Sequence, residues 1–398
     1  MTLWLAGCAS STPPYGPRAP LWGGAEPHPR VLPAERAALD QVAALLAPRG
    51  MGPPTLDARL TRAASALNHR RALDRTREAC EVSPAVVEAA LSWAGIYERP
   101  SCNRCWWSRK EAATVPPEAL QGLADCAAGS GEILVGIATL LDEERTFVTV
   151  LAARRQVTLD PTPRAVGTNA ALEVHAVVPP GGSRRALVAW PGRPVDLVEL
   201  TPVATGNLLK LALPALQSGK PGHVTILDIH GAEAARFHVD PPGLVMPGAF
   251  GPELHVSAQP APMALTNLRA SVQQLRISRG GSTPQVSGVL EAVAQEEANQ
   301  ASAGRGWMSA PVSEPRARQA AEAAASVRVF KLWGPTAEDL GAQLDRNPVA
   351  LWALTRAVPT LVGVGMAATG KDPAHPMLAA VVVVGTTEPD GLALPPAR

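Results

Sequence analysis

The sequence predicts an α+β protein with several domains. In the first and last thirds of the chain, apolar residues recur at helical spacing and each third closes on a pair of apolar runs. The middle third instead contains short alternating runs that are separated by Pro-Gly and Gly-Gly turns, which is typical of antiparallel strands. A chain of 398 residues is long enough for two or three domains with cores of their own.

The overall composition excludes some classes of function. A net charge of +1 provides no field that would attract nucleic acid, so we expect no nucleic-acid partner. With 46% hydrophobic residues the chain is not expected to be disordered. No segment approaches the roughly 18–20 apolar residues of a transmembrane helix.

The first residues resemble a bacterial lipobox, in which a signal peptidase cuts before a lipid-modified cysteine. Residues 5–8 read Leu-Ala-Gly-Cys, and the proline-rich residues 9–53 follow as a tether that includes one amphipathic helix from Pro33 to Leu46. We therefore expect residues 1–8 to be part of a lipoprotein signal and Cys8 to carry the lipid. The seven residues before Cys8 are too few for a complete signal peptide, so either the natural start lies upstream or the motif is a coincidence.

Residues 54–155 predict a helical domain that ends in a β-hairpin. Leu56, Leu60 and Leu67 lie at helical spacing, and Ser83 precedes Pro84 as the N-cap of a second helix. A third helix is expected from Val115, and a loop over residues 98–107. The predicted strands of the hairpin are residues 132–137 and 146–151.

Four cysteines lie in this predicted domain. An even number favours two disulfides in an oxidising compartment, and three pairings are possible. The CxxC spacing of two of them also permits a thiol oxidoreductase. Zinc binding is less favoured because no second CxxC is present. The four residues are Cys80, Cys102, Cys105 and Cys126.

Residues 156–245 predict an antiparallel β-sandwich. Short runs with alternating or continuous apolar residues recur, with turn residues between them. The expected strands cover residues 172–178, 185–190, 195–200, 208–213, 223–229 and 234–239.

Residues 262–390 show a succession of motifs that resembles a known family. Asn347 and Pro348 begin a short helix, residues 360–366 form a "Gly-Val-Gly" strand, and residues 377–384 form an apolar strand. Upstream, residues 265–269 resemble an "LN-x-x-R" helix and residues 288–298 an "L-x-x-x-A-x-x-H-A" helix. This order resembles the CAP/SCP family of cysteine-rich secretory proteins, antigen 5 and pathogenesis-related proteins.

The resemblance implies an α/β/α domain whose cleft gathers two histidines and two acidic residues that can hold a divalent cation. At the matching positions this sequence has Glu297 and Ala350, and the "G-E-N" segment maps loosely to residues 325–327. None of the expected ligands is present, so we expect a degenerate domain with no catalytic residue, no metal and no cofactor. The helix-then-hairpin order of residues 54–155 is similar, which leaves open that it is a second, more diverged copy.

Two other patterns carry little chemistry. Residues 365–372 nearly match a P-loop, but Asp372 replaces the Ser or Thr that reaches magnesium, and prolines follow in place of a helix. The histidines form no metal-binding pair in sequence. His223, His230 and His238 lie on or beside adjacent expected strands and could converge, although solvent-facing strand histidines explain them equally well.

These observations favour a non-catalytic lipoprotein of the cell envelope, at the outer membrane or outside the cell. We expect it to bind the membrane through its lipid anchor and to bind or scaffold an envelope protein or polysaccharide. The alternatives are a secreted CAP-type cation-dependent hydrolase and a thiol oxidoreductase that uses Cys102 and Cys105.

Overall fold

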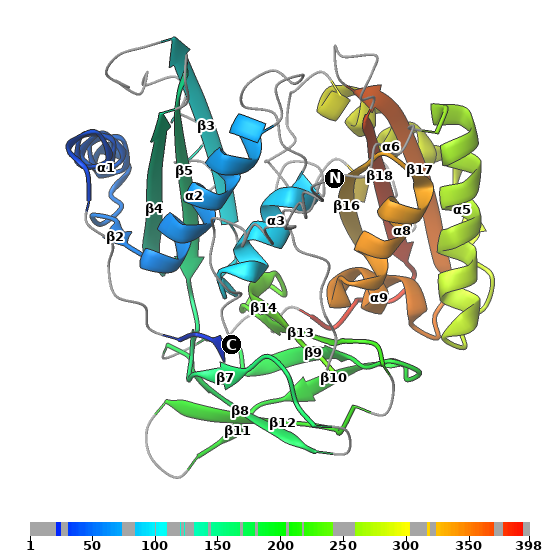
Figure 1. Ribbon diagram of the computed structural model, residues 1–398. Coiled ribbons are helices and arrows are strands. Elements are labelled where there is room, and N and C mark those ends of the chain that lie inside the picture. Colours follow the sequence, from blue (N-terminus) through cyan, green and yellow to red (C-terminus); the bar gives the residue numbers. More distant parts are fainter. Residues whose placement is uncertain are drawn as a thin grey trace, which may run out of the picture.

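The computed structural model combines helices with several antiparallel sheets, in agreement with the expected α+β class. Two α/β domains lie side by side above a third domain whose described elements are all strands (Figure 1). The structure describes residues 21–24, 31–73, 84–99, 101–109, 120, 123, 131–141, 145–167, 170–179, 182–203, 207–216, 219–241, 259–302, 317–318, 324–369 and 377–392.

The first α/β domain is a four-stranded sheet with helices on both faces. Its strand order is β2-β4-β5-β3, with β2 parallel to β4 and the other pairs antiparallel. Helix α1 packs on one face and helices α2 and α3 on the other. The elements are α1 (Pro33–Leu46), η1 (Ala47–Arg49), β2 (Thr55–Leu56), α2 (Ala58–Leu73), α3 (Pro84–Trp93), β3 (Ser101–Arg109), β4 (Glu132–Leu141) and β5 (Arg145–Arg155).

Two expectations for this domain are corrected. The sequence predicts a loop over residues 98–107, but from Ser101 onwards they form strand β3, which pairs along its length with β5. We assigned the helix Pro33–Leu46 to the tether, but its apolar face packs on the sheet, so this packed unit begins at Pro33. The predicted hairpin is confirmed as β4 and β5. Most of the helix expected from Val115 lies outside the described residues.

The last α/β domain has the same strand order, β15-β17-β18-β16, and again its first strand is parallel to its neighbour. Helix α6 packs on one face of this sheet, and α5, α8 and α9 pack on the other. The elements are α5 (Ala261–Ser278), β15 (Gln285–Val286), α6 (Gly288–Ser302), β16 (Ser326–Gly334), α8 (Ala337–Asp345), α9 (Pro348–Thr355), β17 (Thr360–Thr369) and β18 (Met377–Thr386).

The two α/β domains also agree in how their helices join their sheets. The amide of Asp57 donates to the carbonyl of Val135 at 2.8 Å, and the amide of Ser287 donates to the carbonyl of Val362 at 3.0 Å. The next residue along each strand is a glycine: Gly136 lies against α2 and Gly363 lies against α6. A Cβ at either glycine would lie 2.2 Å from a helix carbonyl carbon. The chain therefore contains the same α/β arrangement twice.

The middle domain consists of two four-stranded sheets, β10-β9-β13-β14 and β11-β12-β8-β6, which pack face to face around one apolar cluster. The six strands expected in this region are present. A two-residue strand near the N-terminus, β1, pairs with β7 beside these sheets. The elements are β1 (Leu21–Trp22), β6 (Thr158–Leu159), β7 (Thr162–Pro163), β8 (Leu172–Val177), β9 (Arg185–Ala189), β10 (Val195–Glu199), β11 (Thr201–Pro202), β12 (Leu208–Leu213), β13 (Gly222–Leu227) and β14 (Glu233–Val239).

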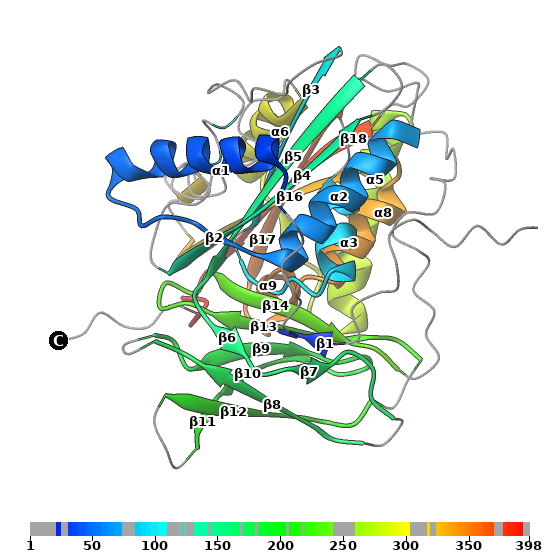
Figure 2. The ribbon, with the colours of Figure 1, turned by 60° about the vertical axis from the view of Figure 1, so that its left-hand side comes forward.

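The strand domain contacts both α/β domains (Figures 1 and 2). The outer face of its first sheet shares an apolar cluster with α5, α8 and α9, in which Leu187 and Leu227 pack with Leu351. On the other side, the amide of Arg236 donates to the carbonyl of Tyr97, so the chain of the first domain runs along the edge of β14. Within the described residues, no helix is long and apolar enough to cross a membrane.

Candidate functional site

The positions that match the family's histidines do not form a shared cleft. Glu297 lies on α6, is 5% exposed, and its Oε2 is 3.3 Å from Nζ of Lys331 on β16. Ala350 lies on α9 and is fully buried in the cluster on the opposite face of the sheet. The sheet therefore separates the two positions, and both are occupied by internal contacts. In the segment matched to "G-E-N", the hydroxyl of Ser326 is paired with Thr386 at 2.8 Å.

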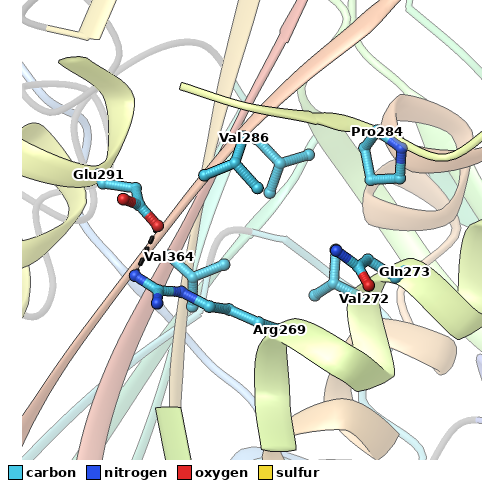
Figure 3. Close-up of a pocket in the computed structure, with 8 residues that line it drawn as sticks. Arg269, Val272, Gln273, Pro284, Val286, Glu291 and Val364 are labelled. Carbon is cyan, nitrogen blue, oxygen red and sulfur yellow. Dashed lines mark ion pairs between the residues drawn. The ribbon is translucent and has the colours of Figure 1, made fainter. Parts of the chain in front are cut away.

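A shallow pocket lies between α5, β15 and β17 (Figure 3). At its rim, Arg269 of the "LN-x-x-R" motif forms an ion pair with Glu291 of α6 at 2.5 Å. The empty volume of about 260 Å³ includes open solvent, and it falls below the roughly 300–1,000 Å³ of typical small-molecule pockets. The pocket suits a single apolar side chain better than a substrate. The remaining lining residues are Val272, Gln273, Pro284, Val286, Val362 and Val364.

Cys102 and Cys105 lie within strand β3, and each is disulfide-bonded. Their side chains point to opposite faces of the sheet because an odd number of residue steps separates them along a strand. A thioredoxin-type CxxC begins a helix, where the helix N-terminus lowers the thiol pKa, and β3 offers no such environment. Cys8, Cys80 and Cys126 lie outside the described residues. Lipidation of Cys8 and the pairing of the other four cysteines therefore stay predictions.

Two of the three candidate histidines meet. His223 on β13 lies directly opposite His238 on β14, with ring centroids 6.0 Å apart, while His230 is exposed in the turn between these strands. Nε2 of His238 is 3.5 Å from Oδ1 of Asp240, and Trp22 packs edge-on against the His238 ring. Burial, with further contributions from His238, Arg346 and Arg236, lowers the pKa of His223 to about 3.

These histidines do not form a recognisable metal site. The part of the chain that the structure describes holds no group of three His, Cys, Asp or Glu side chains arranged for a metal ion. A neutral His223 between strand domain and α/β domains is suited to packing at this junction.

The near-match to a P-loop has no phosphate-binding geometry in its described part. Residues 365–369 continue strand β17 and pair with β18, and residues 370–376 lie outside the described residues. A P-loop would wrap its backbone amides around a phosphate, whereas the amides of a strand hydrogen-bond to the neighbouring strands.

A buried ion network joins helix and loop in the first domain. Oδ1 of Asp57 accepts hydrogen bonds from the amides of Arg59 and Leu60, at 2.8 and 3.2 Å, and so caps α2. The Arg59 guanidinium bridges Asp57 and Glu98, with Nη2 at 2.8 and 2.5 Å from their carboxylates. Burial acts against ionisation of Asp57, but the hydrogen bonds and charge of Arg59 outweigh it and lower the pKa. Arg155 adds a second guanidinium, whose Nη2 lies 3.4 Å from Asp57 and 3.5 Å from Glu98. Two cations therefore balance two carboxylates, and the network has a structural role.

Sequence reasoning did not identify a second buried set in the same domain, formed by Asn68, Arg71 and Thr149. Asn68 and Arg71 lie on the α2 face that packs on the sheet, at i and i+3, a spacing visible in the sequence. Polar residues on the sheet-facing side of this helix were the sequence signal that could have identified the set.

Models of known protein families give no match to this sequence, and curated proteins give none either.

Proposed function

We propose that this chain is a non-catalytic lipoprotein of the cell envelope, anchored through Cys8, which binds or scaffolds an envelope protein or polysaccharide. The observation that carries the proposal is the occupation of the family's cleft positions. Glu297 is buried and paired with Lys331, and Ala350 is packed on the other side of the sheet. A site that binds a catalytic cation or activates a nucleophile needs several polar groups that point toward one place. The two matched positions do not provide such a group of side chains.

The finer architecture is part of the proposal. We assign residues 262–390 to a degenerate CAP-like domain. The α6, sheet and α5/α8/α9 layers support this assignment. The shared strand order supports a second CAP-like copy in the first α/β domain. We assign residues 156–245 to a β-sandwich on the basis of its two packed sheets.

A binding role is supported by the fixed arrangement of the domains. Glu88 on α3 is held by Arg99 of its own domain at 2.7 Å and by Arg236 of the strand domain at 3.2 Å. Together with the apolar cluster that joins Leu187 to α9, these contacts hold the domains in one orientation. Surfaces that are preorganised in this way lose less conformational entropy when they bind a partner.

The proposal is tested by cell fractionation of the protein, expressed from its own gene. The wild-type protein is expected in the membrane fraction, and Cys8→Ser is expected to shift it to the soluble fraction. Ser10→Ala, two residues away, is the matched control and is expected to stay with the membrane. Equal distribution of wild type and Cys8→Ser would contradict the anchor.

The binding role is tested separately. Cross-linking in intact cells is expected to capture one envelope protein or polysaccharide reproducibly with the wild-type chain. Hydrolysis of an ester or peptide substrate by the purified protein, lost on Glu297→Gln, would instead favour the CAP-type hydrolase.

A further inference from the structure

The buried set of Asn68, Arg71 and Thr149 forms a directional chain of hydrogen bonds between α2 and the sheet. Nη1 of Arg71 donates to Oγ1 of Thr149, which donates to Oδ1 of Asn68 at 2.5 Å. Nδ2 of Asn68 in turn donates to the carbonyl of Ala138 on β4 at 2.8 Å. This chain fixes the orientation of the Arg71 guanidinium.

The other edge of the same guanidinium is buried and has no partner in the part of the chain that the structure describes. Arg71 is only 3% exposed, and its Nε and Nη2 are shielded from solvent without a hydrogen-bond partner among the described residues. Among the residues that the structure describes, no carboxylate forms an ion pair with Arg71. Burial lowers the pKa of its guanidinium, and no charged neighbour offsets that effect. A buried cation without a counter-charge is costly, by several kcal/mol in typical proteins.

The last α/β domain shows that the fold does not need these polar groups. Because Asp57 corresponds to Ser287 and Val135 to Val362, the positions of Asn68, Arg71 and Thr149 correspond to Ala298, Ala301 and Val381. All three of these residues are at most 2% exposed and lie in an apolar cluster or beside it. The same arrangement is thus stable with apolar residues at each position.

A helix-capping role alone does not account for this geometry. A cation in the last turn of a helix does interact favourably with the helix dipole, and Arg71 lies in the last turn of α2. That interaction needs only a charge near the final carbonyls, which Arg70 in the same turn also provides. It does not require a hydrogen-bond chain to β5 or the burial of two donor nitrogens that lack a partner among the described residues.

We propose that Arg71 anchors a binding site for a small carboxylate, which Nε and Nη2 hold in a bidentate pair. The parallel N–H groups of this edge match the two oxygens of a carboxylate. One negative charge balances the single positive charge, whereas a doubly charged phosphate would bring an excess. The site is independent of the lipid anchor and of the family resemblance.

A route to this buried edge is expected at the end of α2. Arg71 lies two residues before the last residue of α2, Leu73, and helix ends open more readily than helix centres. Once bound, the carboxylate is shielded from water, where its pairing with arginine is strongest.

The test measures thermal unfolding of the full-length protein in increasing formate or acetate at constant ionic strength, with chloride as the balancing salt. A saturable rise of the unfolding midpoint is expected for the wild type, because a ligand that binds only the folded state stabilises it. Arg71→Met is expected to weaken the apparent affinity by roughly 10- to 100-fold, because the variant loses the charge-assisted hydrogen bonds to the carboxylate. Arg71→Lys keeps the positive charge but lacks the two parallel N–H donors, and it is expected to lose most of that affinity as well.

Two controls keep the proposal falsifiable. Arg36→Met removes an exposed arginine from the same domain and is expected to leave the carboxylate response unchanged. If Arg71→Met does not fold, the triple variant Asn68→Ala, Arg71→Ala, Thr149→Val copies the apolar set of the last domain and is expected to fold without responding to carboxylate.

Two results would overturn the site: a wild-type protein that shows no saturable response, or an equal response in wild type and the Arg71 variants. A dipeptide with a free C-terminus and its amidated form identify the source of the ligand. Tighter binding of the free dipeptide than of acetate assigns the site to peptide C-termini, and the reverse assigns it to small organic acids.

Discussion

Replacing Gly363 by alanine tests how closely α6 lies on its sheet. A Cβ at this position would lie 2.2 Å from the carbonyl carbon of Leu290 and 2.4 Å from the amide nitrogen of Glu291. Ordinary carbon contacts are about 3.5–4.0 Å, so the helix would have to move away by more than about 1 Å. Both contacting atoms are backbone, so no side-chain rotation can relieve the clash. We expect Gly363→Ala to cost about 3 kcal/mol, the upper end of typical overpacking.

Equilibrium unfolding in urea, followed by circular dichroism, measures this change. Gly341→Ala in α8 is the matched control, because its Cβ would lie 3.5 Å from Ser271, and alanine favours a helix by about 1 kcal/mol. It is therefore expected to preserve or raise stability. Gly136→Ala in the first domain is expected to behave like Gly363→Ala, because its Cβ meets Leu60 at the same 2.2 Å. Wild-type stability of Gly363→Ala would refute the close packing of α6.

Three further predictions concern acid stability, a buried arginine and the cysteines. Between about pH 6.5 and 3 the unfolded chain binds a proton that folded His223 does not, so stability falls as pH decreases, by at most about 1.4 kcal/mol per pH unit. His223→Gln is expected to flatten this slope in a pH series of urea unfolding, whereas the exposed His230→Gln is not; equal slopes would contradict the assignment. Arg276→Met leaves three backbone carbonyls, one of them buried, without their donor and is expected to cost about 3 kcal/mol in the same assay, so a neutral effect would show that water replaces the guanidinium. Reduction of the disulfides at Cys102 and Cys105 is expected to remove about 2–5 kcal/mol, measured as a lower unfolding midpoint in calorimetry, and an unchanged midpoint would mean that they add no stability.

Local signals predicted those elements whose causes lie within a few residues. Asn347 caps α9, as Oδ1 accepts from the amides of Val349 and Ala350 at 2.9 and 3.1 Å. Pro348 occupies the first helical turn, where its missing N–H costs nothing. The apolar run that becomes β18 is buried along most of its length between helices on both faces, which explains why it lacks polar alternation.

Elements that depend on distant partners were not predictable in the same way. Strand β3 follows Pro100 and carries the CxxC motif, features typical of a loop, and it becomes a strand by pairing with β5 some forty residues later. Strand β16 was also missed, and it forms by pairing with β18. The two-residue strands β2 and β15 are too short to show a pattern, yet they attach α2 and α6 to their sheets.

The candidate sites show the same limit. The match of Glu297 and Ala350 to two cleft histidines rested on sequence order, whereas the sheet places them on opposite faces. The burial of Arg71 depends on Thr149, which lies 78 residues further along the chain. A chain position alone does not reveal whether a charged residue on a helix face meets solvent or a sheet.

The proposed envelope role is tested most directly by the intact mass of the protein purified from its own membranes, with and without reduction and alkylation. The account predicts loss of residues 1–7, the added mass of acyl chains at Cys8, and four cysteines that react with the alkylating reagent only after reduction. An unprocessed chain with four freely reacting thiols would contradict both the anchor and the disulfides, and would favour a thiol-based function for Cys102 and Cys105.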